Sequence, residues 1–173
     1  RQFGVYYPDK TKDLIALKVM EKVGSKSLVG AMYSYWPCQF EITDKEAAWE
    51  RSIEGMKEVA EAAESLGIEC CQEVLNRYET YIITDCREGL EYCRRVGSEN
   101  VNLLLDTFHM NIEEDNIPEA IRLAGRKLGH LHVGESNRKL PGMGSLPWRD
   151  IGRALRDIGY EKGVVMEPFL LQG

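Results

Sequence analysis

The chain has 173 residues, of which 43% are hydrophobic and 29% are charged, and its formal net charge is −6. This length and composition predict a single globular domain over residues 1–173, with a hydrophobic core of its own. The acidic balance without a basic stripe argues against nucleic acid as a partner, and the lack of any apolar run near the roughly 18 residues of a membrane helix argues against a membrane.

The first part of the chain is predicted to contain two helices and a strand. Apolar residues spaced three apart predict a helix over residues 9–23, and Gly24 suits its end. Residues 28–35 are predicted to form a strand. The sequence Thr-Asp-Lys-Glu at residues 43–46 is typical of a capping box, and it predicts the start of a helix over residues 44–66.

Strands and helices continue to alternate along the rest of the chain. Further strands are predicted over residues 68–75, 101–106, 128–133 and 163–167. The helices between them are predicted over residues 84–96, 118–127 and 147–158. Regular alternation of this kind predicts an α/β fold with a parallel sheet, because parallel neighbours need a crossover helix between them.

The number of strands predicts an incomplete barrel. A closed (β/α)8 barrel takes about 250 residues, whereas the sequence shows about five strand-like segments. The chain also starts at Arg1, without a methionine. We therefore expect the C-terminal part of a (β/α)8 barrel that lacks the first strands.

The cysteines indicate a reducing compartment. There are five of them, an odd number, and no two form a C-x-x-C pair. Cys86 and Cys93 lie two helical turns apart, on the face of their predicted helix that should point inward. We therefore expect reduced, buried thiols in a cytoplasmic protein.

Four of the apolar strand segments end on a side chain that can bind a metal. These side chains are Glu73, Asp106, His132 and Glu167. They recur at intervals of roughly 30 residues, the length of one βα unit. Parallel strands at this spacing place their C-terminal ends at one face, where α/β barrels keep their chemistry. Three carboxylates and one imidazole at that face predict a divalent metal site with mainly oxygen ligands.

Each of these residues also has a simpler interpretation when it is taken alone. Glu73 and Glu167 could be solvated acids at strand ends, and Asp106 could be a helix cap or a turn residue. A single histidine is more often a hydrogen-bonded core residue than a ligand. His130 and His132, however, lie two residues apart and therefore share one strand face, which favours a polar cavity.

Two more residues are expected near the same face. His109 lies three residues after Asp106, just past the end of a predicted strand, and taken alone it could be an exposed loop histidine. Trp36 ends another predicted strand, so it could form the wall of a pocket. Neither residue by itself indicates which ligand the pocket would take.

Four segments around these residues closely resemble a known family. They are EVLNRYE at 73–79, LDTFHMNIEED at 105–115, GHLHVGESNR at 129–138 and VMEPF at 165–169. Together they resemble the ketose 3-epimerases, which are the D-psicose (allulose) and D-tagatose 3-epimerases among the sugar isomerase/epimerase TIM barrels. The resemblance extends over residues 28–169, and it looks closer to the psicose-type than to the tagatose-type enzymes.

The resemblance implies a fold, a cofactor and partners. The fold is a (β/α)8 TIM barrel, and the cofactor is a divalent metal, Mn²⁺, Co²⁺ or Mg²⁺. The implied metal ligands are Glu73, Asp106, His132 and Glu167, the same four residues that the spacing selects. The implied partners are a small ketose substrate and further copies of the chain in a homo-oligomer.

The resemblance also implies a set of substrate-binding residues. Glu79, His109 and Arg138 are expected to contact the sugar hydroxyls. Trp36 and Phe169 are expected to line the pocket that holds the sugar.

The implied reaction is epimerisation of free ketohexoses at C3, as between D-fructose and D-psicose. The C3 proton is removed on one face and returned on the other, through an enediolate that the metal stabilises. Inversion requires a proton carrier on each side of the carbon. Glu73 and Glu167 are the candidates, because their strands are expected to lie across the barrel from one another.

Other functions remain open on the same residues. An aldose–ketose isomerase on the same barrel would use the same metal site but would move a proton between C1 and C2. A non-catalytic sugar-binding barrel would bind a ketose without exchanging its C3 hydrogen. A multi-zinc endonuclease is disfavoured, because the chain has only three histidines and is acidic.

Overall fold

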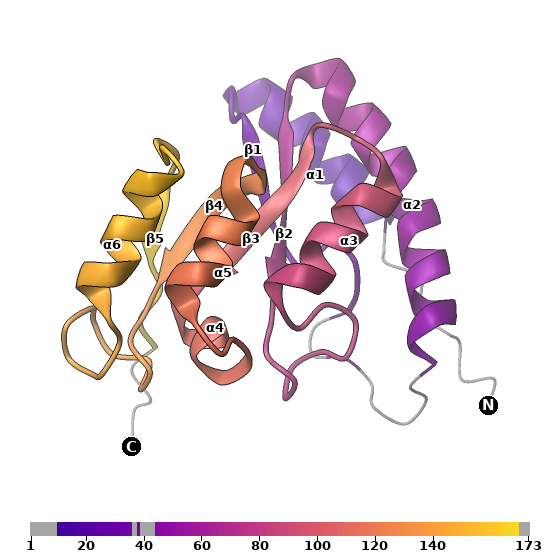
Figure 1. Cartoon of the computed structure of the whole chain (residues 1–173). Helices are drawn as coiled ribbons and strands as arrows, with labels where there is room; N and C mark the ends of the chain where they lie inside the picture. Colours follow the sequence, from indigo (N-terminus) through magenta and orange to yellow (C-terminus); the bar gives the residue numbers. More distant parts are fainter. Residues whose placement is uncertain (1–9, 36–37, 39–43, 170–173) are drawn as a thin grey trace.

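Five parallel strands form one sheet in the computed structural model, which describes residues 10–35, 38 and 44–169. The strands lie in sequence order, so each pairs with the next along the chain (Figure 1). They are β1 (Ser27–Gly30), β2 (Glu69–Val74), β3 (Val101–Asp106), β4 (Leu128–Val133) and β5 (Val164–Met166). Parallel neighbours in sequence order, joined by helices, are the repeating βα unit of a barrel.

Helices cover the sheet in the same order as the strands. They are α1 (Lys10–Val23), α2 (Lys45–Leu66), α3 (Cys86–Val96), α4 (Thr107–Glu113), α5 (Ile117–Ala124), the 3₁₀ turn η1 (Gly125–Lys127) and α6 (Trp148–Asp157). Contacts run from α1 to α2, α2 to α3, α3 to α5 and α5 to α6, which makes one continuous layer (Figure 1). Within the described ranges, no helix combines the length and the apolar character needed to cross a bilayer.

The predicted order of helices and strands is confirmed, with differences at some boundaries. Strand β1 ends at Gly30, several residues earlier than predicted, because Gly30 adopts a φ of +137° and its carbonyl accepts the backbone N–H of Met32 at 3.0 Å. The N-cap of α2 is Asp44, whose side chain accepts the backbone N–H of Ala47 at 3.1 Å. Thr43, the predicted capping residue, lies outside the described residues.

Helix α4 was not predicted from the sequence. It begins directly after β3, and its N-cap is Asp106, whose carboxylate accepts the backbone N–H of Phe108 at 2.8 Å. The sequence left strand-end ligand and helix cap as alternative interpretations of Asp106. The structure shows that Asp106 caps the helix with Oδ1. Its second carboxylate oxygen, Oδ2, accepts from Arg138 Nη1 at 2.8 Å and stays available to the strand-end cluster. His109 consequently lies on a helix and not in an exposed loop.

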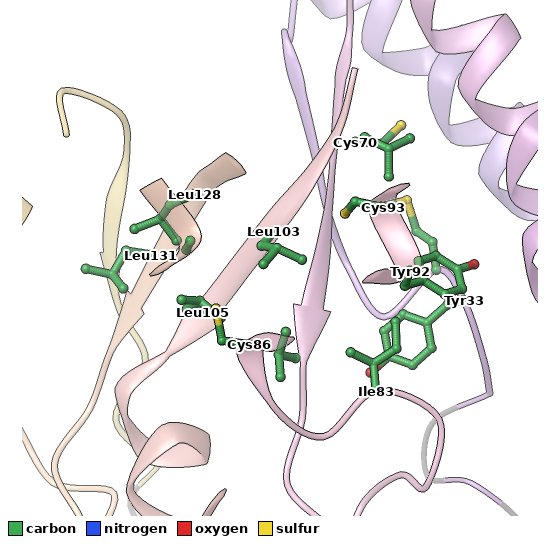
Figure 2. Packing of buried hydrophobic residues seen from close by; sticks show 14 of the residues in the cluster. Tyr33, Cys70, Ile83, Cys86, Tyr92, Cys93, Leu103, Leu105, Leu128 and Leu131 are labelled. Atoms are coloured by element: carbon green, nitrogen blue, oxygen red, sulfur yellow. The ribbon is translucent and has the colours of Figure 1, made fainter. Parts of the chain in front are cut away.

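The hydrophobic core lies between the sheet and the helix layer (Figure 2). Its fully buried members from the strands and helices include Leu103, Leu105, Leu128, Leu131, Tyr92 and Ile121. Cys86 and Cys93 of α3 point into it, as predicted, and their thiols are free. Burial raises the pKa of the Cys93 thiol to about 12, so the group remains protonated and acts as a small apolar side chain.

Candidate metal centre

The four strand-end residues selected by their spacing meet at one place. Glu73 lies near the end of β2, Asp106 ends β3, His132 lies near the end of β4, and Glu167 follows β5 directly. Each offers one ligand atom, and these atoms all lie within 4.8 Å of one another. The convergence follows from the topology, because parallel strands in sequence order end at the same face of the sheet.

His132 lies between the two glutamates. Its Nδ1 atom is 3.6 Å from Glu73 Oε1 and 3.4 Å from Glu167 Oε2, and it is buried without a hydrogen-bond partner. Burial alone would lower the pKa of His132, but the carboxylates of Glu73, Glu167 and Asp106 outweigh burial and raise it. Nδ1 of His132 thus faces the carboxylates of Glu73 and Glu167, and a positively charged group between these three side chains would be stabilised.

Asp106 is completely buried, although it carries a carboxylate. Burial raises its pKa, and this effect is opposed by His109, by the backbone N–H of Phe108 and by Arg138. Arg138 Nη1 donates to Asp106 Oδ2 at 2.8 Å and lies 3.4 Å from Glu167 Oε2. A single guanidinium therefore faces two of the three carboxylates of the cluster, which leaves negative charge uncompensated.

The residues of the cluster fit a divalent cation. Carboxylate oxygens suit Mg²⁺ and Mn²⁺, and an added imidazole is accepted by Mn²⁺ and Co²⁺. The unpartnered Nδ1 of His132 is the atom that a cation would use, since a buried polar atom without a partner is costly. The negative charge of three clustered carboxylates would be neutralised in the same step.

An irregularity in β4 sets the position of His132. Leu103 pairs with Leu128, but Leu104 pairs with His130, so Gly129 has no partner in β3. This bulge shifts the register by one residue and places His132 opposite Asp106. With a regular register, Asp106 would face the neighbouring leucine of β4, because a shift of one residue exchanges the two faces of a strand.

Replacement of Gly129 by alanine is expected to destabilise the fold. The added Cβ would lie 2.5 Å from Cys71 Sγ and 3.0 Å from Asn102 Cβ, so these neighbours on β2 and β3 must shift. We expect a loss of about 1–3 kcal/mol in the free energy of unfolding, measured by urea denaturation. The control is Gly152→Ala in α6, whose Cβ would meet only Arg156 Nη1 at 3.8 Å and should not lower stability. Equal stability of the Gly129 variant and the native chain would contradict this account of the bulge.

His109 and Glu79 lie beside the cluster. The side chain of His109 is 3% exposed, and its Nε2 is 3.9 Å from both Glu73 Oε1 and Asp106 Oδ2. Its other nitrogen, Nδ1, lies 3.7 Å from Glu79 Oε1. The structure thus places two of the predicted substrate-binding residues next to the predicted metal ligands, on α4 and on the loop after β2.

Arg138 reaches the cluster from the loop after β4. Its guanidinium lies over the ring of Phe108 at 4.0 Å and faces the ring of Phe169 at 4.9 Å, distances typical of cation–π contacts. Arg138 has a φ of +59°, and its carbonyl accepts the backbone N–H of Phe169 at 3.0 Å. Phe169 therefore lies beside Arg138, and its role in lining the sugar pocket stays a prediction. Trp36, the other predicted pocket residue, lies outside the described residues.

Comparison with known proteins identifies the family. The sequence profile of the xylose isomerase-like TIM barrels matches residues 12–171. The chain belongs to this family. The predicted fold, part of a (β/α)8 barrel, is confirmed by this family and by the five parallel strands. The resemblance to ketose 3-epimerases is also confirmed, since enzymes named D-psicose 3-epimerase match most of this chain.

The relatives include curated epimerases and their structures. The chain is 54% identical over 158 residues to the D-psicose 3-epimerase of Ruminiclostridium cellulolyticum, covering 91% of this chain and 54% of the relative. It is 48% identical to the D-psicose 3-epimerase of Agrobacterium fabrum, covering 91% and 55%. A crystal structure of D-psicose 3-epimerase with D-tagatose from Clostridium cellulolyticum superposes with a TM-score of 0.92 at 52% identity, covering 95% of this chain and 57% of that one. The chain thus spans about half the length of the curated relatives it matches.

The structural role of one acidic residue of this xylose isomerase-like barrel was not predicted from the sequence. Glu135 is fully buried, and its carboxylate accepts the backbone N–H groups of Gly142 at 2.8 Å and Leu146 at 3.2 Å, as well as the indole N–H of Trp148. Its carbonyl accepts the backbone N–H of Arg138 at 2.9 Å. The carboxylate therefore holds together the loop that carries Arg138. The only signal in the sequence is an acid in a loop rich in glycine and serine, which does not indicate burial.

Replacement of Glu135 by glutamine is expected to destabilise the barrel by about 1–3 kcal/mol at neutral pH, because one amide oxygen replaces two acceptor oxygens. Burial would raise the pKa of Glu135, but the hydrogen bonds from Trp148, Gly142 and Leu146 outweigh burial and lower it. A lowered folded pKa stabilises the protein above the unfolded pKa of about 4.3 and loses that contribution as pH falls through the folded pKa. The difference in melting temperature should therefore be largest near neutral pH and shrink in acid.

The matched control for Glu135 is Glu99→Gln, because the side chain of Glu99 is 99% exposed and forms only a 3.5 Å surface contact with Lys127. We expect its melting temperature to follow that of the native chain at every pH. A Glu135 variant that melts with the Glu99 variant across this range would show that the buried carboxylate does not stabilise the loop.

Proposed function

We propose that the protein epimerises free ketohexoses at C3, as between D-fructose and D-psicose, with a divalent cation, Mn²⁺ or alternatively Co²⁺ or Mg²⁺. The observation that carries the proposal is the placement of Glu73 and Glu167. These carboxylates come from β2 and from the end of β5, and both lie within 3.6 Å of the same nitrogen of His132. The similarity to enzymes named D-psicose 3-epimerase supports the same substrate class.

The two glutamates would carry the proton. One carboxylate removes the hydrogen from C3, and the other delivers a proton to the opposite face of that carbon. The reverse reaction exchanges the two roles. Stabilisation of the negative charge that develops on the ketose oxygens would come from the bound divalent cation. Glu73, Asp106, His132 and Glu167 would hold that cation, so the two proton carriers would also be ligands.

The neighbouring residues would bind and orient the sugar. Glu79 offers carboxylate oxygens to hydroxyl groups, and His109 and Arg138 offer N–H groups to oxygens near the reacting carbon. Phe169 would cover an apolar face of the ring or chain, and Trp36 remains a predicted pocket residue. This arrangement holds C3 in a fixed position between the two carboxylates, which proton transfer requires.

The decisive experiment follows hydrogen exchange in D₂O. Metal binding to the purified protein is first measured by calorimetry, and D-fructose is then added with Mn²⁺ present. We expect D-psicose that carries deuterium at C3, detected by NMR after removal of the metal. Deuterium at C1 or C2 together with an aldose product would indicate an isomerase instead. Bound metal and bound ketose without exchange at C3 would indicate a sugar-binding protein and would refute the proposal.

We also propose that residues 1–173 form one domain and that the protein acts as a homo-oligomer in the cytoplasm, without nucleic acid or a membrane as partner. The shared core between the sheet and all neighbouring helices supports a single domain. The net charge of −6 disfavours nucleic acid. Light scattering coupled to size-exclusion chromatography would test the oligomer, and a purely monomeric mass would contradict it.

A further inference from the structure

A buried asparagine joins two of the proposed substrate-binding residues. Asn76 lies in the loop after β2 and is 2% exposed. Its Nδ2 atom donates to Glu79 Oε1 at 2.8 Å and lies 2.7 Å from Nδ1 of His109. One amide group therefore contacts both an acid and an imidazole that border the metal centre. An amide side chain does not itself transfer protons, so any role of Asn76 must come from the groups that it contacts.

The orientation of the amide is determined by its other neighbour. The backbone N–H of Tyr78 points at Oδ1 of Asn76 at 2.9 Å. A backbone N–H can only donate, so this side of the amide must be the oxygen. The Glu79 carboxylate on the opposite side accepts, so that side must be the nitrogen. Both neighbours require the same orientation, and the NH₂ group therefore faces His109.

This orientation determines which nitrogen of His109 carries the hydrogen. Nδ1 receives the NH₂ group of Asn76 at 2.7 Å and lies 3.3 Å from its backbone N–H. A ring nitrogen that accepts these donors cannot itself carry a hydrogen. If it did, three N–H groups would converge, and the nearest carboxylate oxygen, of Glu79, would be 3.7 Å away. The hydrogen consequently belongs on Nε2.

The contact on the other side of the ring favours the opposite assignment, because a guanidinium can only donate, but it is the weaker of the two contacts. Nη2 of Arg138 lies 3.4 Å from Nε2 of His109. This distance is long for an N–H···N hydrogen bond, whereas the 2.7 Å contact with Asn76 is short. The shorter contact decides the position of the hydrogen. The Nε2–H group then points toward the metal centre, where Nε2 is 3.9 Å from both Glu73 Oε1 and Asp106 Oδ2.

We propose that Asn76 is a positioning residue that keeps the hydrogen of His109 on Nε2. His109 thereby presents a hydrogen-bond donor to a carbonyl or hydroxyl oxygen of the ketose, and it does not compete with Glu73 as a proton acceptor. The same amide holds Glu79, so both contacts with the sugar depend on one buried side chain. The identity of the sugar oxygen rests on the proposed function, whereas the position of the hydrogen on His109 does not.

Nitrogen NMR of the histidine rings tests the position of the hydrogen directly. The chain has only three histidines, so a protein labelled with ¹⁵N-histidine and loaded with Mg²⁺ gives few signals, and His109→Gln assigns the one of interest. In the native protein we expect Nδ1 of His109 to resonate as an unprotonated nitrogen and Nε2 as a protonated one. In Asn76→Asp, a carboxylate oxygen replaces the NH₂ group and accepts from Nδ1, so the two signals should exchange character. kcat for D-fructose should fall about 10–100-fold in this variant.

Two further variants distinguish the effect of Asn76 on the His109 hydrogen from a general loss of structure. Asn102→Asp makes the same chemical change beside a carboxylate, since Nδ2 of Asn102 donates to Glu69 Oε1 at 2.5 Å, but it has no contact with His109. It should leave the His109 signals unchanged. Asn76→Ala leaves only the 3.3 Å backbone N–H at Nδ1 and releases Glu79, so the two ring signals of His109 should move toward the averaged values of a mixture of tautomers, and KM should rise more than kcat falls.

Three results would overturn the proposal. They are a native protein with the hydrogen on Nδ1, an Asn76→Asp variant with unchanged ring signals, and an Asn102→Asp variant with the same exchange of signals. If the signals behave as expected but D-fructose is not turned over, the role of Asn76 stands and the proposed reaction fails. The two conclusions are therefore tested separately.

Discussion

Glutamine in place of Glu73 or Glu167 is expected to abolish epimerisation while the chain remains folded. The amide retains the size of the carboxylate but can neither remove nor deliver a proton at C3. Loss of one general acid–base group costs about 10²–10⁴-fold in rate, and loss of a charged ligand adds to this. Each variant is tested by deuterium incorporation at C3 of D-fructose and D-psicose in D₂O. Circular dichroism checks that the fold persists.

The control for these variants is Glu58→Gln. Glu58 is a surface acid that forms a 2.7 Å ion pair with Lys10, both side chains being about half exposed. Its loss changes the charge by the same amount but should leave turnover unchanged, since exposed pairs contribute little. Native turnover in either the Glu73 or the Glu167 variant would reject a mechanism with two proton carriers. Loss of turnover in the Glu58 variant would show that the charge change itself is harmful.

Removal of metal ions is expected to inactivate the protein, and added Mn²⁺ or Co²⁺ should restore turnover. Chelation leaves three carboxylates clustered around His132 with Arg138 as their main counter-charge. Binding of a cation to the folded state only should raise stability by about 2.7 kcal/mol at a concentration 100 times Kd. The measurements are turnover after EDTA treatment and the melting temperature with and without Mn²⁺.

His132→Ala is the matched variant for this experiment. It removes the imidazole nitrogen without changing the carboxylates, so the rise in melting temperature with Mn²⁺ should be lost or greatly reduced. Full turnover after exhaustive chelation would contradict the requirement for a metal. An equal Mn²⁺-dependent rise in the His132 variant would place the cation elsewhere on the protein.

The order of elements was accessible from the sequence because each rests on local signals. The apolar spacing and the glycine at its end predicted α1, the capping box predicted the start of α2, and short apolar runs predicted the strands. Helix α4 was not predicted because its N-cap, Asp106, is also the last residue of β3. The local sequence does not show that one residue can end a strand and cap the next helix. Strand β1 was predicted too long because a positive φ at Gly30 is a property of the folded backbone.

The sequence by itself determined that the four strand-end residues meet, because a spacing of about one βα unit in a parallel α/β chain brings strand ends to one face. It could not determine their alignment. The unpaired Gly129 puts His132 opposite Asp106, and this depends on the register between two strands that are distant along the chain. The role of Glu135 as a hydrogen-bond acceptor and the orientation of the Asn76 amide likewise depend on which donors and acceptors surround each buried side chain. These neighbours come from other parts of the loops and strands, so only the tertiary structure decides them.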